Sequence, residues 1–312
     1  MSQAVEQAIV LAVGRGTSLR PLTRNRPMIM LPVLGKPVAV RVMERLRPAG
    51  IGRFAVVIDE QGGELAAYLK SSWYPDLNVS LTVQLMTAGL GEALAQAAST
   101  LDGPFVLTSA DILTPPDFVP KLVRWFEMSG KDMVIGLGQT PYSQAGSFYP
   151  VQVAGDTLAA IEPASQDMPD AAYGAFLTCV CVPSLLPYLT DVDGRLYGER
   201  DLVGCIQRML RDGVRIGYML ADWHVRLMHV DDLLGFNRFL LEEGADAHIL
   251  SELPGSVRVV VPVRVDPQVS VGPGAQIGPN VYLEAGSTVG QGAQISDSVV
   301  LTGGVVAAGA RV

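Results

Sequence analysis

Two glycines near the start of the chain are the first residues whose positions suggest chemistry. The apolar stretch 8–13 runs directly into Gly14-Arg15-Gly16-Thr17, and the backbone N–H groups of such a turn can hold a phosphate group. The loop lacks the Gly-Lys-Ser/Thr of a Walker loop, and Leu19 stands where a dinucleotide fingerprint has its third glycine. Taken alone, the loop indicates either phosphate contact or an ordinary tight turn.

Asp111 follows the apolar stretch 104–107 much as Gly14 follows the stretch 8–13. If both stretches are parallel strands, the two residues lie beyond the carboxyl ends of the strands, where open α/β sheets bind their ligands. The alternative is that Asp111 only caps the end of its strand.

The remaining reactive residue types point to structural roles. The three histidines, His224, His229 and His248, have no cysteine or carboxylate at a metal-ligand spacing. Cys179 and Cys181 are separated by one residue, which suits neither a zinc knuckle nor a redox pair. With Cys205 they are expected to be buried thiols.

The elements that would position these residues alternate along the first part of the chain. Short apolar runs predict strands at 8–13, 54–58, 79–85, 104–107 and 133–137, and helical periodicity predicts helices at 38–47, 64–69, 92–101 and 117–128. This alternation indicates an α/β fold with a Rossmann-like, mostly parallel sheet and helices on both faces.

The last part of the chain has a different period. Aliphatic anchors recur every six residues, with small or branched residues two positions before each anchor. Such a period predicts a left-handed parallel β-helix built from hexapeptide repeats. The anchors are Val265, Val271, Ile277, Leu283, Val289, Ile295, Leu301 and Ala307.

These patterns predict a domain at 1–240, a linker at 241–254 and the β-helix at 255–312, with a connecting helix within 231–250. An open end of a β-helix exposes unpaired backbone. We therefore expect the end near Val312 to be covered by another chain or by further residues, with the repeats forming a homo-oligomer or hetero-oligomer.

Composition narrows the function classes. The 312 residues are 49% hydrophobic and 17% charged, and the formal net charge is −8. This balance excludes disorder as the main state and argues against a nucleic-acid partner. No apolar run approaches the length of a membrane span, so no membrane partner and a cytoplasmic location are expected.

A longer stretch is much more specific than the two glycines. LAVGRGTSLRPLTRNRPMIMLPVLGKPV resembles the signature of the sugar-1-phosphate nucleotidyltransferases, namely Leu-Ala-Ala-Gly-x-Gly-Thr-Arg-Leu-x-Pro-Leu-Thr followed by Pro-Lys-Pro and Gly-Lys-Pro. Further segments resemble the family in the same order: Ala49-Gly50-Ile51, Gly89-Leu90-Gly91-Glu92, Asp111, Trp223 and Asp232-Leu233-Leu234. Several members also carry a C-terminal left-handed β-helix.

The resemblance implies a reaction and a set of binding residues. A sugar 1-phosphate oxygen attacks the α-phosphate of a nucleoside triphosphate and pyrophosphate leaves, with charge held by Mg²⁺ and by Lys or Arg. The implied sugar contacts are Glu162 and Gly174, and the implied metal ligand is Asp111. The implied nucleotide contacts are Leu11, Gly14, Arg15, Gly16, Thr17, Gly89, Gly91 and Glu92.

The chain departs from the family at the charged positions. The family's loop Arg falls on Ser18 and its Lys falls on Met28. Its second metal-binding Asp aligns with Arg226 when anchored on the Asp232 segment, and with Val225 when counted from Trp223. No catalytic residue is therefore assigned, Mg²⁺ at Asp111 is doubtful, and an ion pair between Asp111 and Arg226 is an alternative. Lost transition-state contacts of this kind often cost about 10²–10³ in rate each.

Three functions follow from these observations. The first is binding of a nucleotide or nucleotide sugar with impaired or no turnover, as a regulatory or sensor subunit. The alternative is an active nucleotidyltransferase in which Arg15, Arg20, Arg24 or Arg26 replaces the missing charges. An acyltransferase working from the repeats is disfavoured, because residues 255–312 contain no His.

Overall fold

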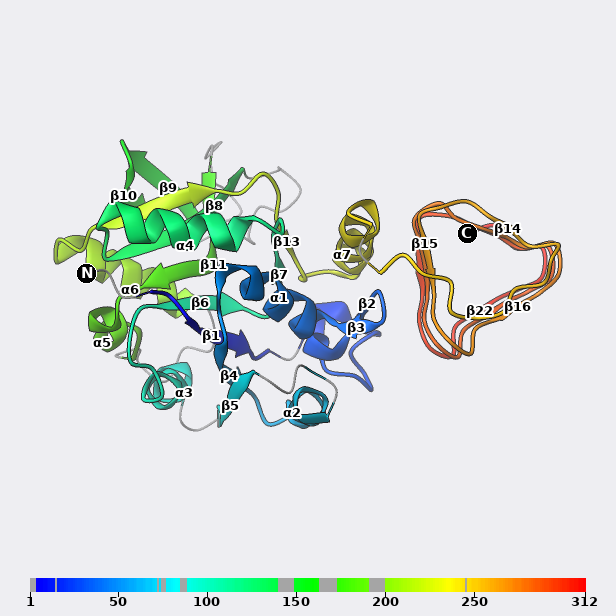
Figure 1. Ribbon diagram of the computed structural model, residues 1–312, viewed down its shortest axis with the longest axis horizontal. Coiled ribbons are helices and arrows are strands. Elements are labelled where there is room, and N and C mark those ends of the chain that lie inside the picture. Colours follow the sequence, from blue (N-terminus) through cyan, green and yellow to red (C-terminus); the bar gives the residue numbers. More distant parts are fainter. Residues whose placement is uncertain are drawn as a thin grey trace. The chain divides into compact units, whose positions relative to one another are not determined.

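The computed structural model describes residues 4–14, 16–71, 73, 77–84, 89–139, 149–162, 173–190, 200–244 and 246–312. The chain forms two compact units (Figure 1). The sheet unit contains Met1–Gly16, Pro27–Ile29 and Ala39–Arg226, and the C-terminal unit contains Thr17–Arg26, Met30–Val38 and Leu227–Val312. The units do not follow the predicted boundaries, because two pieces of the signature stretch group with the C-terminal residues.

A nine-stranded sheet is the core of the sheet unit, in the order β5-β4-β1-β6-β11-β8-β12-β10-β9. The first strands are nearly continuous apolar runs, and every residue of β1 is buried, as expected for strands covered on both sides. The strands are β1 (Gln7–Ala12), β4 (Arg53–Ile58), β5 (Asn78–Val83), β6 (Phe105–Ser109), β8 (Met133–Gln139), β9 (Tyr149–Ala154), β10 (Thr157–Ile161), β11 (Tyr173–Cys181) and β12 (Ile216–Leu220).

The sheet is mixed: the prediction of a mostly parallel sheet holds for the direction of most strands, but β11 and β10 run against the others. Strands β5, β4, β1 and β6 run parallel, as do β8 and β12. Strand β11 lies antiparallel between β6 and β8, and β10 is antiparallel to both β9 and β12. The turn Gly155-Asp156 is too short for a crossover, so β9 and β10 form a hairpin.

Helices pack on the sheet through apolar stripes. Helix α4 buries Phe118, Val119, Leu122, Val123 and Phe126, at the spacing of one helix face. The helices of the sheet unit are α1 (Val38–Leu46), α2 (Gly63–Ser71), α3 (Gly89–Ala98), α4 (Phe118–Ser129), α5 (Leu186–Thr190) and α6 (Arg200–Arg211). The predicted helices at 38–47, 64–69, 92–101 and 117–128 correspond to α1, α2, α3 and α4, with ends that differ by a few residues.

In the C-terminal unit the repeats form three parallel sheets of three short strands (Figure 1). Their aliphatic residues share one buried cluster that includes Val265, Ile277, Leu283 and Ile295. The strands are β14 (Arg258–Val259), β15 (Val263–Val265), β16 (Ser270–Val271), β17 (Gln276–Ile277), β18 (Val281–Leu283), β19 (Thr288–Val289), β20 (Gln294–Ile295), β21 (Ser298–Val300) and β22 (Val305–Val306).

The strict six-residue period fails at the end of the chain. Val265 pairs with Leu283, 18 residues later, but Leu283 pairs with Val300, 17 residues later. The corner before β21 is one residue shorter than the corner before β18. The predicted anchors Leu301 and Ala307 are therefore wrong: Val306 is part of the buried cluster, and the partly buried Val300 packs against it.

Two further elements complete the C-terminal unit. Strands β2 (Pro32–Val33) and β3 (Lys36–Pro37) form a hairpin through Leu34 and Gly35, both with positive φ, as a two-residue type I′ turn requires. Helix α7 (Val230–Glu242) covers only part of the predicted connecting helix, because the chain turns at Gly244 with φ 73°. No helix in the described part of the chain has the length and apolar character needed to cross a membrane.

Candidate functional site

Asp111 lies in the turn that follows β6, and the residue is buried. The backbone N–H of Ala110 donates to the carbonyl of Leu11 at 2.9 Å, which fixes this turn to the end of β1. The Ser109 hydroxyl donates to Oδ1 of Asp111 at 2.5 Å. The predicted meeting of the ends of β1 and β6 is therefore confirmed, since Leu11 also pairs with Ser109.

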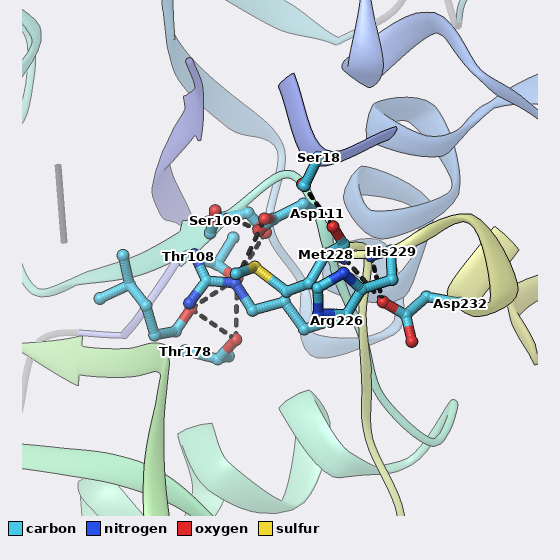
Figure 2. Close-up of polar contacts among 10 residues, drawn as sticks. Ser18, Thr108, Ser109, Asp111, Thr178, Arg226, Met228, His229 and Asp232 are labelled. Atoms are coloured by element: carbon cyan, nitrogen blue, oxygen red, sulfur yellow. Dashed lines mark hydrogen bonds and ion pairs between the residues drawn. The ribbon is translucent and has the colours of Figure 1, made fainter. Parts of the chain in front are cut away.

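Arg226 pairs with the second oxygen of the same carboxylate (Figure 2). Strand β13 (Val225–Arg226) runs antiparallel to β7 (Ile112–Leu113), and this pairing sets Arg226 opposite Ile112. Arg226 Nε lies 3.3 Å from Asp111 Oδ2, and the two side chains are 14% and 7% exposed. The alternative of an ion pair between Asp111 and Arg226 is thus what the structure contains, whereas Val225 is a buried apolar residue.

A divalent cation does not fit these donors. Mg²⁺ prefers several oxygen ligands in an octahedral arrangement, but one oxygen of Asp111 accepts from Ser109 and the other from Arg226. No group of three His, Cys, Asp or Glu residues that could hold a metal occurs among the residues the structure describes. The positive charge beside this carboxylate is the Arg226 guanidinium.

The glycine loop after β1 is closed by an acidic residue that the sequence did not single out. Gly14 has φ 129°, a conformation open to glycine alone. Its N–H donates to Asp59 Oδ2 at 3.2 Å, while Oδ1 accepts from Gln61 N at 2.9 Å. Asp59 directly follows β4, and Gly14 lies just after the neighbouring parallel strand β1. The position of Asp59 at the end of a predicted strand could therefore have indicated that it lies near Gly14. A backbone group suited to a phosphate here donates to a carboxylate.

Met28 lies beside the same loop. It sits in a short 3₁₀ turn (Met28–Met30) and is 7% exposed. Its Cε would be 3.6 Å from a Cβ placed on Gly14. Where the resemblance would put a lysine, the loop therefore meets an apolar thioether.

Ser18 belongs to the C-terminal unit, and its hydroxyl donates to the Met228 carbonyl at 2.5 Å (Figure 2). Asp232 accepts from the N–H groups of Met228 and His229 at 2.8 Å and 2.6 Å, which caps the start of α7. Ser18 thus fastens a turn within its own unit. Ser18 lies in a short 3₁₀ turn (Thr17–Leu19) that begins at Thr17. Gly16, with φ 54°, is grouped with the sheet unit.

Other predicted nucleotide contacts are described only in part. Helix α3 begins at Gly89 instead of at residue 92, so Gly89 and Gly91 join Glu92 in its first turn. The side chain of Glu92 and all of Arg15 lie outside the described residues.

The predicted sugar contacts both border Pro150. The N–H of Glu162, which is exposed at the end of β10, donates to the Pro150 carbonyl at 2.9 Å, and Gly174 pairs with Pro150 between β11 and β9. The residues 163–172 between them lie outside the described part. The structure therefore brings Glu162 and Gly174 to one place on the sheet.

His224 packs next to this place and was not expected there. Its ring stacks on Phe176 with centroids 4.5 Å apart, and a Cβ on Gly138 would lie 2.1 Å from its Cε1. Gly138 pairs with Gly174, so this stack abuts the predicted sugar contacts. Burial lowers the pKa of His224 to about 4, which keeps the imidazole neutral at pH 7.

Comparisons with known proteins show what the chain resembles. Residues 7–160 match the family model described as nucleotidyl transferase. The low-salt glycan biosynthesis nucleotidyltransferase Agl11 of Haloferax volcanii is 27% identical over 241 residues, and the glucose-1-phosphate thymidylyltransferase of Streptomyces griseus is 26% identical over 251 residues. Each alignment covers 76% of this chain and 66% of the relative, just under two thirds of its length.

A solved structure matches the fold at lower identity. The structure of a putative glucose-1-phosphate thymidylyltransferase from Bacillus anthracis, in complex with sucrose, is 18% identical and superposes with a TM-score of 0.65. The match covers 76% of this chain and 95% of that one.

Proposed function

We propose that this chain, whose residues 7–160 match the nucleotidyl transferase family model, binds a nucleotide or nucleotide sugar with impaired or no turnover. In this role it acts as a regulatory or sensor subunit. The observation that carries the proposal is the 3.3 Å pair between Arg226 and Asp111. A reaction at phosphorus needs positive charge that moves onto the transferred group, whereas this guanidinium is already engaged by a buried carboxylate.

The two other changed positions support the same conclusion. Ser18 is neutral and its hydroxyl is bound to the Met228 carbonyl. Met28 is neutral, apolar and buried against the glycine loop. The loop itself keeps the positive φ values of Gly14 and Gly16, although a phosphate would have to displace Asp59 from the N–H of Gly14. The glycine conformations are thus retained while the charges needed for transfer are replaced.

Calorimetric titration tests the binding half of the proposal. Nucleotide sugars and nucleoside triphosphates are titrated in EDTA and again in Mg²⁺, and at least one nucleotide sugar is expected to bind equally well in both. Pyrophosphate release from triphosphate and sugar 1-phosphate pairs is measured in parallel. Turnover above about 1 s⁻¹, near ordinary enzyme rates, would overturn the proposal in favour of an active nucleotidyltransferase. Absence of binding to every nucleotide in the set would overturn it as well.

A pair of glycine substitutions locates the ligand. Gly14→Ala strains a loop residue with φ 129°, and Gly130→Ala strains the residue that ends α4, with φ 61°. Both replace a positive-φ glycine in the sheet unit, so both lower stability. Only Gly14→Ala is expected to weaken nucleotide binding, and equal losses in the two variants would place the ligand elsewhere.

We also propose that the three C-terminal sheets are faces of a left-handed β-helix. Support comes from the 18-residue register that links Arg258, Gln276 and Gln294 in one sheet and from the shared aliphatic interior. A crystal structure decides the hand of the coil, and a right-handed coil would refute the proposal.

A further inference from the structure

Tyr282 is a fully buried tyrosine on β18 of the C-terminal unit, and it is the only tyrosine of that unit in the sequence. Its hydroxyl accepts from the N–H of Gly35 at 3.1 Å and donates to Asp266 Oδ2 at 2.8 Å. Burial, followed by the bond to Asp266, raises the pKa of Tyr282 far above its usual value. The hydroxyl therefore keeps its proton and joins the β2–β3 hairpin to the C-terminal strands.

Arg264 packs onto the same hairpin. Its Nε lies 2.7 Å from Asp266 Oδ1, and its Nη1 donates to the Asp246 carbonyl at 3.0 Å. A Cβ placed on Gly35 would lie 2.3 Å from Nη2 of Arg264. Gly35 is therefore required twice, once by its φ of 79° and once by the guanidinium that covers it.

Other residues of the C-terminal unit hold Leu34 of the β2–β3 hairpin and Arg26 of the segment before the hairpin. Arg26 Nη1 lies 2.9 Å from Glu284 Oε1, and the other oxygen of Glu284 accepts from Thr302 N at 2.8 Å. The N–H of Leu34, a residue held at φ 46°, donates to Asn237 Oδ1 at 3.0 Å. The side chains of Asn237 and Tyr282 are nearly inaccessible to water, so the bonds that these two side chains make to Leu34 and Gly35 form without competition from solvent.

We infer that the C-terminal strands position the signature loop, defined as Thr17–Arg26 together with Met30–Val38. Tyr282, Arg264 and Glu284 are positioning residues that hold this loop in one conformation. The inference that the loop is held in one conformation does not depend on the proposed function. Its consequence for a ligand does rest on the proposed function, because Thr17 of this loop is one of the implied nucleotide contacts.

The consequence for a ligand is one of preorganisation. A loop that is already ordered loses less conformational entropy on binding, and a loop that is ordered only part of the time weakens the apparent affinity by the ordered fraction. Loosening the anchor is therefore expected to slow association and to leave the dissociation rate unchanged.

Hydrogen exchange of the full chain tests the inference. Tyr282→Phe deletes the hydroxyl and retains the ring, and Tyr218→Phe is the matched control, because its hydroxyl donates to the Gly155 carbonyl at 3.0 Å in the sheet unit. In Tyr282→Phe the amides of residues 31–38 are expected to exchange about three- to ten-fold faster, the equivalent of one hydrogen bond. The amides of β14–β22 stay protected, and Tyr218→Phe leaves residues 31–38 unchanged.

A milder variant keeps the test decisive if Tyr282→Phe does not fold. Glu284→Gln removes the charge that pairs with Arg26 and is expected to raise exchange in residues 20–26. Unchanged exchange of the loop in both variants would overturn the inference, as would exchange that rises equally across all C-terminal strands.

Nucleotide association rates then separate the two proposals. Association about three- to ten-fold slower in Tyr282→Phe, at an unchanged dissociation rate, supports positioning of the loop for its ligand. If the wild-type chain binds no nucleotide while the exchange results hold, the proposed function fails and the assignment of the positioning residues stands.

Discussion

Two buried aspartates, each paired with an arginine, lie in different units of this chain. Asp111 in the sheet unit is 3.3 Å from Arg226 Nε, and its other oxygen accepts from Ser109. Asp266 in the C-terminal unit is 2.7 Å from Arg264 Nε, and its other oxygen accepts from Tyr282. The two sites use the same chemistry, an arginine and a hydroxyl on one buried carboxylate.

The two pairs differ in where the backbone puts them. Arg264 lies on β15 and Asp266 follows directly after this strand, so the two residues of this pair are close in the sequence. Through Tyr282, Asp266 is linked to the hairpin residue Gly35. Asp111 and Arg226 are far apart in the sequence and meet beyond the carboxyl ends of β1 and β6, where α/β sheets bind ligands. An arginine–aspartate pair thus lies among the C-terminal strands in one unit and at the ligand-binding edge of the sheet in the other.

The largest expected effect comes from breaking the pair in the C-terminal unit. Asp266→Ala leaves Arg264 buried without its closest carboxylate and Tyr282 without its acceptor, so the C-terminal unit is expected to lose about 3–5 kcal/mol of stability. Hydrogen exchange of β14–β22 during denaturant titration measures this loss. A loss below about 1 kcal/mol, the size expected for a surface pair, would mean that the two aspartates are not alike.

The second prediction tests whether Arg226 stands in for a cation. Arg226→Asp places a second carboxylate beside Asp111, so the sheet unit is expected to lose about 2–4 kcal/mol in EDTA and to recover much of it in millimolar Mg²⁺ or Mn²⁺. Trp73, Trp125 and Trp223 all belong to the sheet unit, so tryptophan fluorescence follows this unit alone.

A surface variant is the control for that measurement. Arg215→Asp removes an exposed pair with Asp132, with side chains 64% and 36% exposed, and is expected to show no cation dependence. If Arg226→Asp is equally indifferent to Mg²⁺ and Mn²⁺, Arg226 is an ordinary structural residue.

The sequence was a good guide wherever the signal was local. Apolar runs and helical periodicity predicted strands such as 54–58 and helices such as 117–128 within a few residues of β4 and α4. The alternative of an ion pair between Asp111 and Arg226 came from alignment to a family motif and is present in the structure. These features depend on short segments or on a fixed order of motifs.

Features that depend on distant pairing could not be predicted in this way. Nothing near Gly35 indicates that its N–H bonds to Tyr282, and nothing near His224 indicates that it stacks on Phe176. The six-residue period also gave no sign of the shorter corner before Ser298, because Leu301 and Ala307 are as apolar as the residues that replace them. Side chains alone do not report such a one-residue shift.

The third prediction concerns pH and belongs to the sheet unit. Burial lowers the pKa of His224 from 6.5 to about 4. Between about pH 4 and pH 6.5, His224 is therefore protonated in the unfolded chain and neutral in the folded chain. The stability of the folded state therefore falls as pH drops from about 6.5 to about 4, by about 2–3 kcal/mol. His224→Phe keeps a ring against Phe176 and is expected to remove this part of the pH dependence. Identical pH profiles of tryptophan-monitored unfolding in the two proteins would contradict it.

The smallest expected effect tests the register of the C-terminal unit. Val305 is 74% exposed and Val306 is 8% exposed, although a strict six-residue period would turn Val305 inward. Val306→Ala removes two methyl groups from the buried cluster and is expected to cost about 1 kcal/mol, whereas Val305→Ala is expected to change stability by less than about 0.5 kcal/mol. The two variants delete the same atoms from neighbouring residues, so only the side of the strand differs. A larger loss in Val305→Ala would restore the six-residue register and would place Ala307, rather than Val306, inside the coil.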